Sequence, residues 1–283
     1  MKKKLDTKII SPDLEIYDQN RGKIRTSKGG WKIGTGVVCH GYDMMNDLVG
    51  QCSYMQVVIL NATGRLPSRE VGDWFEAIHI CMSWPDPRIW CNQIGALAGL
   101  TRCSPVAAAV AGTLANDSRS YGSGTLVEGA RFIRQALLQI TEQGKTVKDL
   151  IEYECSQKGG KPQIMGFARP IAKGDERVSA MIGLAKNLGF EIGDHLSLAF
   201  EIEKYLLENY DESMNINGYI SGFLSDQGFL PEEIYRIFSV VVASGVTACY
   251  IDTHDKPADT YLPLRCDDIE YQGHEAREVP EPV

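Results

Sequence analysis

From residue 44 almost to its end, this 283-residue chain places apolar side chains at the spacing of an α-helix. Leu48, Cys52, Met55 and Ile59 follow one another at intervals of three or four residues, which sets them on one face of a helix. Further helical patterns cover residues 125–142, 146–157, 174–188 and 194–209. Because little of the chain remains for strands, the periodicity predicts a nearly all-helical, all-α fold.

The sequence also marks where several helices begin. Ser68 precedes Glu70 at the start of one apolar stripe, and Ser104 precedes Pro105, a pairing typical of an N-cap followed by proline at the first helical position. Pro231 is followed by two acidic residues, which suit the positive end of the helix dipole. We therefore expect helices to begin near residues 69, 105 and 231.

The N-terminal region has a different pattern. Leu14 and Ile16 lie before the turn residues 20–22, and Ile24 lies after them. Glycines then interrupt the chain at positions 29, 30, 34 and 36. Alternating apolar residues bounded by glycine-rich turns are typical of strands, so residues 8–40 are predicted to form short strands and turns.

Composition excludes several classes of protein. The net charge of -8 argues against a broad surface for nucleic acid or anionic lipid, and no apolar run follows the basic start, as a signal peptide would require. The apolar stretches, such as residues 237–243, are too short to span a membrane. The eight cysteines include no CxxC pair, which favours thiols in a reducing compartment over a disulfide or zinc framework. We expect a cytoplasmic protein without a metal site.

Three loop-to-helix segments carry the chemistry. In residues 120–130, small residues precede a helix whose free N–H groups would suit an anion or a polarised carbonyl, although taken alone the segment is better explained as a plain helix cap. In residues 166–177, Arg169, Lys173 and Arg177 recur every four residues, a spacing suited to carboxylates or phosphates or to a solvated basic helix start. The third segment covers residues 215–222.

Taken in order, these segments resemble the citrate synthase superfamily, and more closely its shorter citryl-CoA lyase-like branch. Residues 41–48 (GYDMMNDL) are similar to the family's "GYD..DL" opening, and residues 60–67 (LNATGRLP) to its "L..GrlP" turn. The three segments resemble, in order, the family's "HGG..EA", "GFGHP.yk.gDpR" and "NVDg.ia..l.dlG" segments. The resemblance extends from about residue 36 to 273, with the order and spacing kept nearly throughout.

The resemblance implies a two-domain helical fold. Residues 1–122 and 229–283 would form the large domain, and residues 123–228 a small domain that closes over the substrate. Members of the family work as homodimers, so a homodimer is expected. Their substrate is a coenzyme A thioester with a small carboxylate, and the family chemistry needs no metal and no permanently bound cofactor.

The three positions that are catalytic in the family are all altered here. The family uses a histidine to polarise the thioester, a second histidine to activate the acceptor carbonyl and an aspartate to remove the alpha proton. The resemblance places Ser123, or its neighbour Gly124, at the first position, Arg169 at the second and Asn217 at the third. An asparagine is no general base at neutral pH, and an arginine stays charged. A polarising site would remain, without a proton-transfer pair.

Other positions match the family better. Arg177 matches the arginine that grips a substrate carboxylate, and Arg265 resembles a late arginine that completes this carboxylate site. Lys173 matches a basic residue near the CoA phosphates. The five histidines share no metal-ligand spacing.

Two classes of function follow from this pattern. The first is an acyltransferase or lyase that makes or breaks a carbon-carbon bond between an acyl-CoA and an oxo or hydroxy acid, without ordinary citrate synthase activity. The second is a catalytically silent homologue that binds acyl-CoA or carboxylate ligands or supports a partner enzyme. A plain CoA-thioester hydrolase has less support, because no Ser-His or Cys-His pair is evident. If the protein is an enzyme, its enolate would arise by decarboxylation of a malonyl-type thioester or by cleavage of a 3-hydroxyacyl-CoA.

Overall fold

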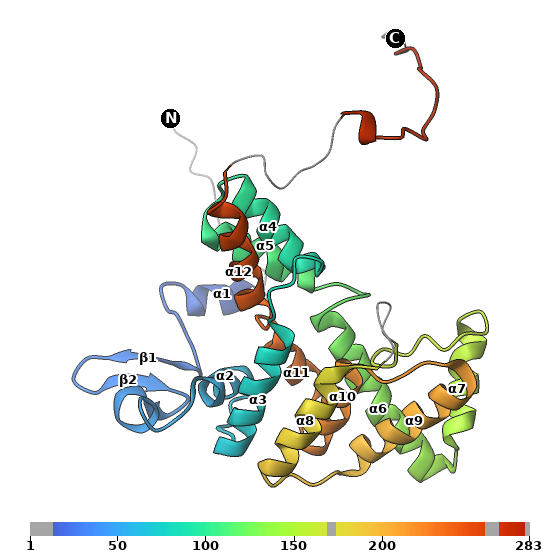
Figure 1. Ribbon diagram of the computed structural model, residues 1–283. Helices are drawn as coiled ribbons and strands as arrows, with labels where there is room; N and C mark the ends of the chain where they lie inside the picture. The colour runs from blue at the N-terminus through green and yellow to red at the C-terminus, as the bar shows by residue number, and fades with distance from the viewer. Residues whose placement is uncertain (1–13, 169–173, 258–265, 281–283) are drawn as a thin grey trace, which may run out of the picture. The chain divides into compact units, whose positions relative to one another are not determined.

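The computed structural model describes residues 14–168, 174–257 and 266–280, and Figure 1 shows their arrangement. The chain divides into two compact units, residues 1–76 and 77–283. The domain boundaries predicted at residues 122 and 228 both lie within the second unit and stay a prediction.

The first unit combines short helices with a small sheet. Its elements are α1 (Glu15–Asn20), β1 (Gly29–Lys32), β2 (Gly36–Cys39), β3 (Tyr42–Asp43), the π-helical turn η2 (Met44–Leu48), α2 (Tyr54–Thr63) and the first part of α3 (Arg69–Met82). The predicted strands are therefore present from residue 29 onwards. The prediction is wrong for residues 15–20, which form a helix. None of these six residues is buried, so no sheet face holds them extended.

The three strands form an antiparallel sheet in the order β1-β2-β3. Gly29 pairs with Cys39 and Val38 with Asp43, which fixes the register. The β2–β3 turn has positive φ angles at both His40 (49°) and Gly41 (90°), the backbone of a type I′ hairpin turn. A Cβ at Gly29 would lie 2.2 Å from the carbonyl oxygen of Val38, so this position of the sheet requires glycine.

The predicted helix starts are confirmed. The apolar stripe is only partly one helix: α2 begins at Tyr54, after a reciprocal capping box of Ser53 and Gln56, so Leu48 lies in η2 and Cys52 in the turn before α2. Met55 and Ile59 of the stripe are buried in α2. The helix α3 begins directly after Ser68. The other two starts, Pro105 and Pro231, are those of α5 and α11 in the second unit.

The second unit contains the remaining helices. They are the end of α3, α4 (Trp90–Leu100), α5 (Pro105–Asn116), α6 (Ser123–Gln143), α7 (Val147–Gln157), α8 (Glu176–Asn187), α9 (Asp194–Tyr210), α10 (Ile216–Asp226), α11 (Pro231–Phe238), α12 (Ala243–His254) and the 3-10 turn η3 (Cys266–Asp268). Together with the first unit, these elements confirm an all-α fold with short N-terminal strands.

Helices α4, α5 and α12 pack side by side (Figure 1). Glycines make their close approach possible. A Cβ at Gly95 of α4 would lie 2.5 Å from the carbonyl oxygen of Val246, and one at Gly112 of α5 would lie 2.5 Å from the Val246 side chain. Small residues at these positions let the helix axes come together.

Helix α10 lies in the core of the unit, against α6 and α9. All residues from Gly218 to Ser225 are buried, so the helix has no solvent-facing side there. Its first turn meets the loop before α8, because a Cβ at Gly166 would lie 2.7 Å from the Cα of Gly218. This packing brings the second and third loop-to-helix segments together.

One segment of the described residues, Pro231–His254, is long and apolar enough to cross a membrane by length and composition. Our expectation that no apolar stretch reaches that length was wrong for this segment, because α11, the turn after it and α12 together exceed the run 237–243. Half of its apolar window is buried inside the protein. A buried core helix of a soluble protein can have the same length and apolar composition.

Candidate active site at the starts of α6, α8 and α10

The first segment begins α6 with a buried serine. Gly122 precedes the helix with a φ of 75°, and Ser123 follows with 2% of its surface exposed. The Ser123 hydroxyl donates to the carbonyl oxygen of Phe238 at 3.0 Å and accepts from Asn116 Nδ2 at 2.9 Å. Both hydrogen bonds tie the start of α6 to neighbouring helices. A thioester contact by Ser123 stays a prediction, and such a contact would compete with these two bonds.

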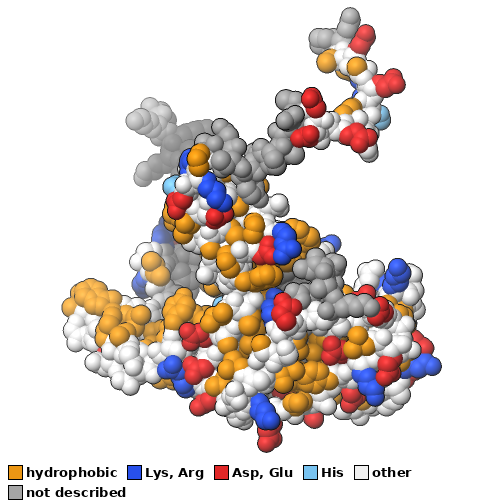
Figure 2. All heavy atoms as spheres, in the orientation of Figure 1, with side chains coloured by type: hydrophobic (Ala, Val, Ile, Leu, Met, Phe, Trp, Pro, Cys, Tyr) orange, Lys and Arg blue, Asp and Glu red, His pale blue; other side chains and the backbone are white. Residues whose placement is uncertain are grey.

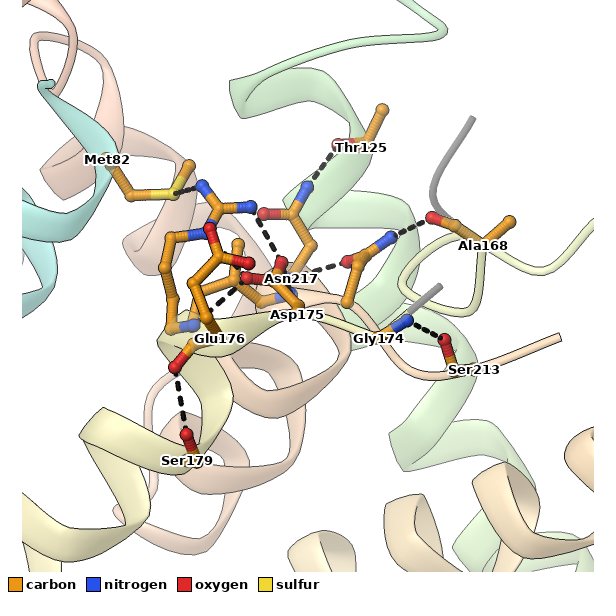
Figure 3. Close-up of polar contacts among 12 residues, drawn as sticks. Met82, Thr125, Ala168, Gly174, Asp175, Glu176, Ser179, Ser213 and Asn217 are labelled. Atoms are coloured by element: carbon orange, nitrogen blue, oxygen red, sulfur yellow. Dashed lines mark hydrogen bonds and ion pairs between the residues drawn. The ribbon is translucent and has the colours of Figure 1, made fainter. Parts of the chain in front are cut away.

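Two residues further along, Thr125 connects the first segment to the third. Its hydroxyl donates to the carbonyl oxygen of Gly122 at 2.7 Å and accepts from Asn217 Nδ2 at 2.7 Å (Figure 3). Thr125 is 5% exposed, so these bonds are shielded from water. Sequence reasoning did not assign Thr125 a role. The signal was its place in the first turn of α6, beside the Ser123 that we had singled out.

The third segment is fastened to the second by Asn215, the N-cap of α10. Asn215 Oδ1 accepts from the backbone N–H of Asn217 at 2.8 Å, as an N-cap does. Asn215 Nδ2 donates to the carbonyl oxygen of Ala168 at 2.6 Å. The backbone N–H of Asn215 donates to the carbonyl oxygen of Gly166 at 2.9 Å. The start of α10 is therefore held against the loop that leads into the second segment.

A buried carboxylate joins α8 to α10. Asp175 is the N-cap of α8, and its side chain is 0% exposed. Arg177 donates to Asp175 through Nε at 2.8 Å and through Nη2 at 2.7 Å, and the backbone N–H of Ile216 donates to Asp175 Oδ2 at 2.9 Å. Figure 3 shows Asp175 next to Asn217, between the two helix starts. Asp175 thus positions both Arg177 and the first turn of α10.

Arg177, which the sequence predicts to bind a substrate carboxylate, already uses part of its guanidinium group in the ion pair with Asp175. Its side chain is 20% exposed, and its Nε–Nη2 edge faces Asp175. Nη1 also lies 3.6 Å from the Met82 sulfur. A ligand carboxylate would therefore meet the outer N–H groups of Nη1 and Nη2 and not the full guanidinium fork.

Two groups near the site resist ionisation. Burial raises the pKa of Tyr121, and the nearby Cys91 raises it further, although the positive charge of Arg177 opposes the shift. Burial also raises the pKa of the Cys91 thiol, whose sulfur lies 3.7 Å from the Tyr121 hydroxyl. At neutral pH neither group is a ready base, since each stays protonated.

Three of the predicted site residues, Arg169, Lys173 and Arg265, lie outside the described residues. Beside the first gap, Ala168 accepts from Asn215, and the backbone N–H of Gly174 donates to Ser213 Oγ at 2.9 Å. The other three predicted residues lie among the described residues. Asp175 links Arg177 to the first turn of α10, which contains Asn217. Ser123 lies two residues before Thr125, to which Asn217 donates.

A cavity of about 400 Å³ lies beside these segments. Its apolar lining includes Phe132, Leu150 and Ile164, and its polar lining includes Arg131 and Lys158. It adjoins the first segment at its Glu128 and the second just before Gly166. Within the described residues, no three His, Cys, Asp or Glu side chains are grouped so that they could hold a metal ion.

Comparison by sequence finds no counterpart: no protein-family model matches the chain, and no curated protein matches it. Comparison by structure finds several. A citryl-CoA lyase from Hydrogenobacter thermophilus has a TM-score of 0.76 at 23% identity over 91% of this chain and 97% of that one.

Two longer proteins are also similar in structure. An ATP citrate lyase from Methanothrix soehngenii, in complex with citrate and coenzyme A, has a TM-score of 0.73 at 15% identity over 97% of this chain and 47% of its own. A citrate synthase from Thermoplasma acidophilum, with carboxymethyl coenzyme A and oxaloacetate, has a TM-score of 0.63 at 16% identity over 81% of this chain and 59% of its own. The protein therefore has a fold like that of citrate synthase, shared with citryl-CoA lyase over nearly the whole of both chains.

Proposed function

We propose that this protein binds a coenzyme A thioester together with a small carboxylate and forms or breaks a carbon-carbon bond between them. The observation that carries the proposal is the meeting of the three loop-to-helix segments: Thr125 bonds Asn217, Asn215 bonds Ala168, and Asp175 bonds Ile216. Similar folds hold citrate with coenzyme A, or a coenzyme A analogue with oxaloacetate. The cavity touches the first segment only at Glu128, and Ser123, Arg177 and Asn217 do not line it, so it carries no part of this proposal.

The described part of the site favours polarisation over proton abstraction. Asn217 has no basic group, and the pKa values of Tyr121 and Cys91 are raised, so none of the three would remove an alpha proton at neutral pH. The nearby Asp175 carboxylate is already paired with Arg177 and with the backbone N–H of Ile216. Hydrogen-bond donors and the arginines would instead stabilise an oxyanion. We therefore propose that an enolate arises by cleavage of a carbon-carbon bond, as in decarboxylation or cleavage of a hydroxyacyl thioester.

The second candidate is a catalytically silent homologue that binds the same ligands or supports a partner enzyme. Two observations favour it: the Ser123 hydroxyl makes two hydrogen bonds within the protein, and one edge of Arg177 is taken by Asp175. Both residues already serve the packing of the helices around them. A silent homologue that binds the same ligands would share the ligand site with the enzyme and differ from it only in lacking turnover.

We further propose a cytoplasmic homodimer that contacts neither nucleic acid nor membrane. Helix α5 carries no charged residue, and Val106, Val110 and Leu114 on one of its faces are 71%, 54% and 70% exposed. Hydrophobic side chains are also exposed on the visible face of the α4, α5 and α12 group (Figure 2). A helix without a polar face is usually covered, and a second copy of the same helix would cover it across a two-fold axis. The buried free thiols Cys91, Cys155 and Cys249 suit a reducing compartment.

A thermal-shift screen tests the central proposal. Acyl-CoAs and di- and tricarboxylates should raise the melting temperature, because ligands that bind the native state stabilise it. Turnover of hydroxyacyl and malonyl thioesters, followed by mass spectrometry, then separates the enzyme from the silent homologue. The absence of a shift with every CoA ester would contradict the proposed ligand.

A further inference from the structure

One buried polar atom of the site has no partner. Asn217 Oδ1 has almost no accessible surface and accepts no hydrogen bond within the described residues. The other polar groups of this residue are all paired: Nδ2 donates to Thr125, the backbone N–H donates to Asn215, and the carbonyl oxygen accepts from Ser221. An unpaired buried acceptor lowers stability, so its retention calls for an explanation.

The orientation of this amide follows from its neighbour. Thr125 uses its one hydroxyl proton to donate to the carbonyl oxygen of Gly122, so Thr125 Oγ1 can only accept from residue 217. A flipped amide would set two acceptor oxygens against each other. With Thr125 donating to Gly122, Nδ2 faces Thr125 and Oδ1 is the unpaired atom.

We propose that Asn217 is a specificity-determining residue, whose carbonyl oxygen, oriented by Thr125, accepts a hydrogen bond from a hydroxyl group on the acyl part of the ligand. The inference rests on the proposed function, since it takes a CoA thioester to bind at the start of α10. An acceptor of this kind favours a hydroxyl over a carboxylate, whose two oxygens are themselves acceptors. Of the two thioesters considered above, the site thus selects the 3-hydroxyacyl over the malonyl ester.

Burial of Oδ1 sets the condition for this contact. The ligand reaches the oxygen only when the atoms that now cover it shift, and the contact is then made in a site shielded from water. A hydrogen bond to this buried oxygen exchanges no protein–water bond, although the ligand hydroxyl gives up its own hydrogen bond to water, so the gain is that of one net hydrogen bond. A ligand without the hydroxyl would leave the atom unpaired and gain nothing from it.

The test compares two ligands that differ by one hydroxyl group. Calorimetry on the full chain would measure the affinities for 3-hydroxybutyryl-CoA and butyryl-CoA. The wild-type protein should bind the hydroxy ester about three- to tenfold more tightly, the factor expected from one neutral hydrogen bond. Asn217→Ala should bind the two esters equally. Thr125→Val should lose most of the preference, and Thr125→Ser, which keeps the hydroxyl, should retain it.

A matched control and a second readout separate specificity from structure. Asn209 is an exposed asparagine whose Nδ2 donates within α9, and Asn209→Ala should leave the preference unchanged. A purely structural role of Asn217 would alter the melting temperature without altering the ratio of the two affinities. If Asn217→Ala does not fold, Asn217→Ser and the two Thr125 variants carry the same comparison.

The outcomes are distinct. Equal affinities of the wild-type protein for the two esters, or a preference that survives in Asn217→Ala, would overturn this inference and leave the proposed function standing. Failure of the wild-type protein to bind any CoA ester would overturn both.

Discussion

Replacing the buried carboxylate of Asp175 by an amide should destabilise the protein. In Asp175→Asn, one oxygen and one NH2 group replace two acceptor oxygens. Those oxygens now accept from Arg177 through Nε and Nη2 and from the backbone N–H of Ile216. At least one of these donors would then face another N–H group. The perturbation therefore affects the Arg177 side chain and the first turn of α10 together.

The magnitude follows from the burial of the pair. The Asp175 side chain is 0% exposed and that of Arg177 is 20% exposed. Removing one partner of a buried ion pair costs about 3–5 kcal/mol. Because Arg177 retains some exposure and the asparagine keeps one acceptor, we expect the lower end, about 3 kcal/mol. For a unit of this size that loss lowers the melting temperature by about 6–12 °C.

Scanning calorimetry with and without a responding ligand measures this effect. The control is Asp252→Asn, which removes an exposed i,i+4 ion pair with Lys256 and should change the melting temperature little. Asp175→Asn should also weaken ligand binding, since it releases Arg177 and loosens the turn that carries Asn217. If the two variants were equally stable, the view that Asp175 holds the two helix starts together would be refuted.

Four further outcomes are expected. Acetyl-CoA and oxaloacetate should not be condensed at an enzymatic rate, because a missing general base costs on the order of a hundredfold to ten-thousandfold; rapid exchange of deuterium from solvent into the acetyl-CoA methyl group would reveal a base elsewhere. Arg177→Ala and Arg265→Ala should each weaken carboxylate binding by about 2–5 kcal/mol in calorimetry, and unchanged affinity in both would remove them from the site. Val110→Glu on α5 should turn a dimer into monomers in analytical ultracentrifugation, while a protein that sediments as a monomer before mutation would contradict the proposed interface. Burial raises the pKa of Asp226, but hydrogen bonds from His195 and from the backbone outweigh burial and keep the pKa below its usual range. The stability that this carboxylate provides is therefore present above its unfolded pKa of about 3.9 and is lost as the pH falls through the lower folded value. Asp226→Asn should accordingly flatten the acid limb of a curve of stability against pH.

Local signals in the sequence were sufficient for most of the helices. Ser104 with Pro105, and Pro231 with its acidic neighbours, are interactions within one turn, and they mark α5 and α11 at the predicted residues. The apolar stripe through Met55 and Ile59 likewise reports burial directly. The exception is α1, where the apolar alternation of Leu14 and Ile16 predicted a strand. Residues 15–20 form a helix instead, and none of them is buried.

The sequence by itself also predicted which segments carry chemistry. Because a motif depends on residue types and their order, the resemblance predicts Asn217 at the position where the family keeps a base. Apolar periodicity predicted the helical class and motif order predicted the citrate synthase fold, and structural similarity to citryl-CoA lyase confirms both.

Tertiary structure alone decided which polar atoms of the site are already hydrogen-bonded within the protein and which remain unpaired. Thr125 and Asn217 are 92 positions apart, and Asp175 and Ile216 are 41 apart, so no local pattern could pair them. Their hydrogen bonds depend on the packing of α6, α8 and α10, which brings three helix starts together. The direction of each hydrogen bond then depends on every neighbouring donor, as the hydroxyl of Thr125 shows. For this reason the unpaired carbonyl oxygen of Asn217 and the committed edge of Arg177 became visible only in the folded protein.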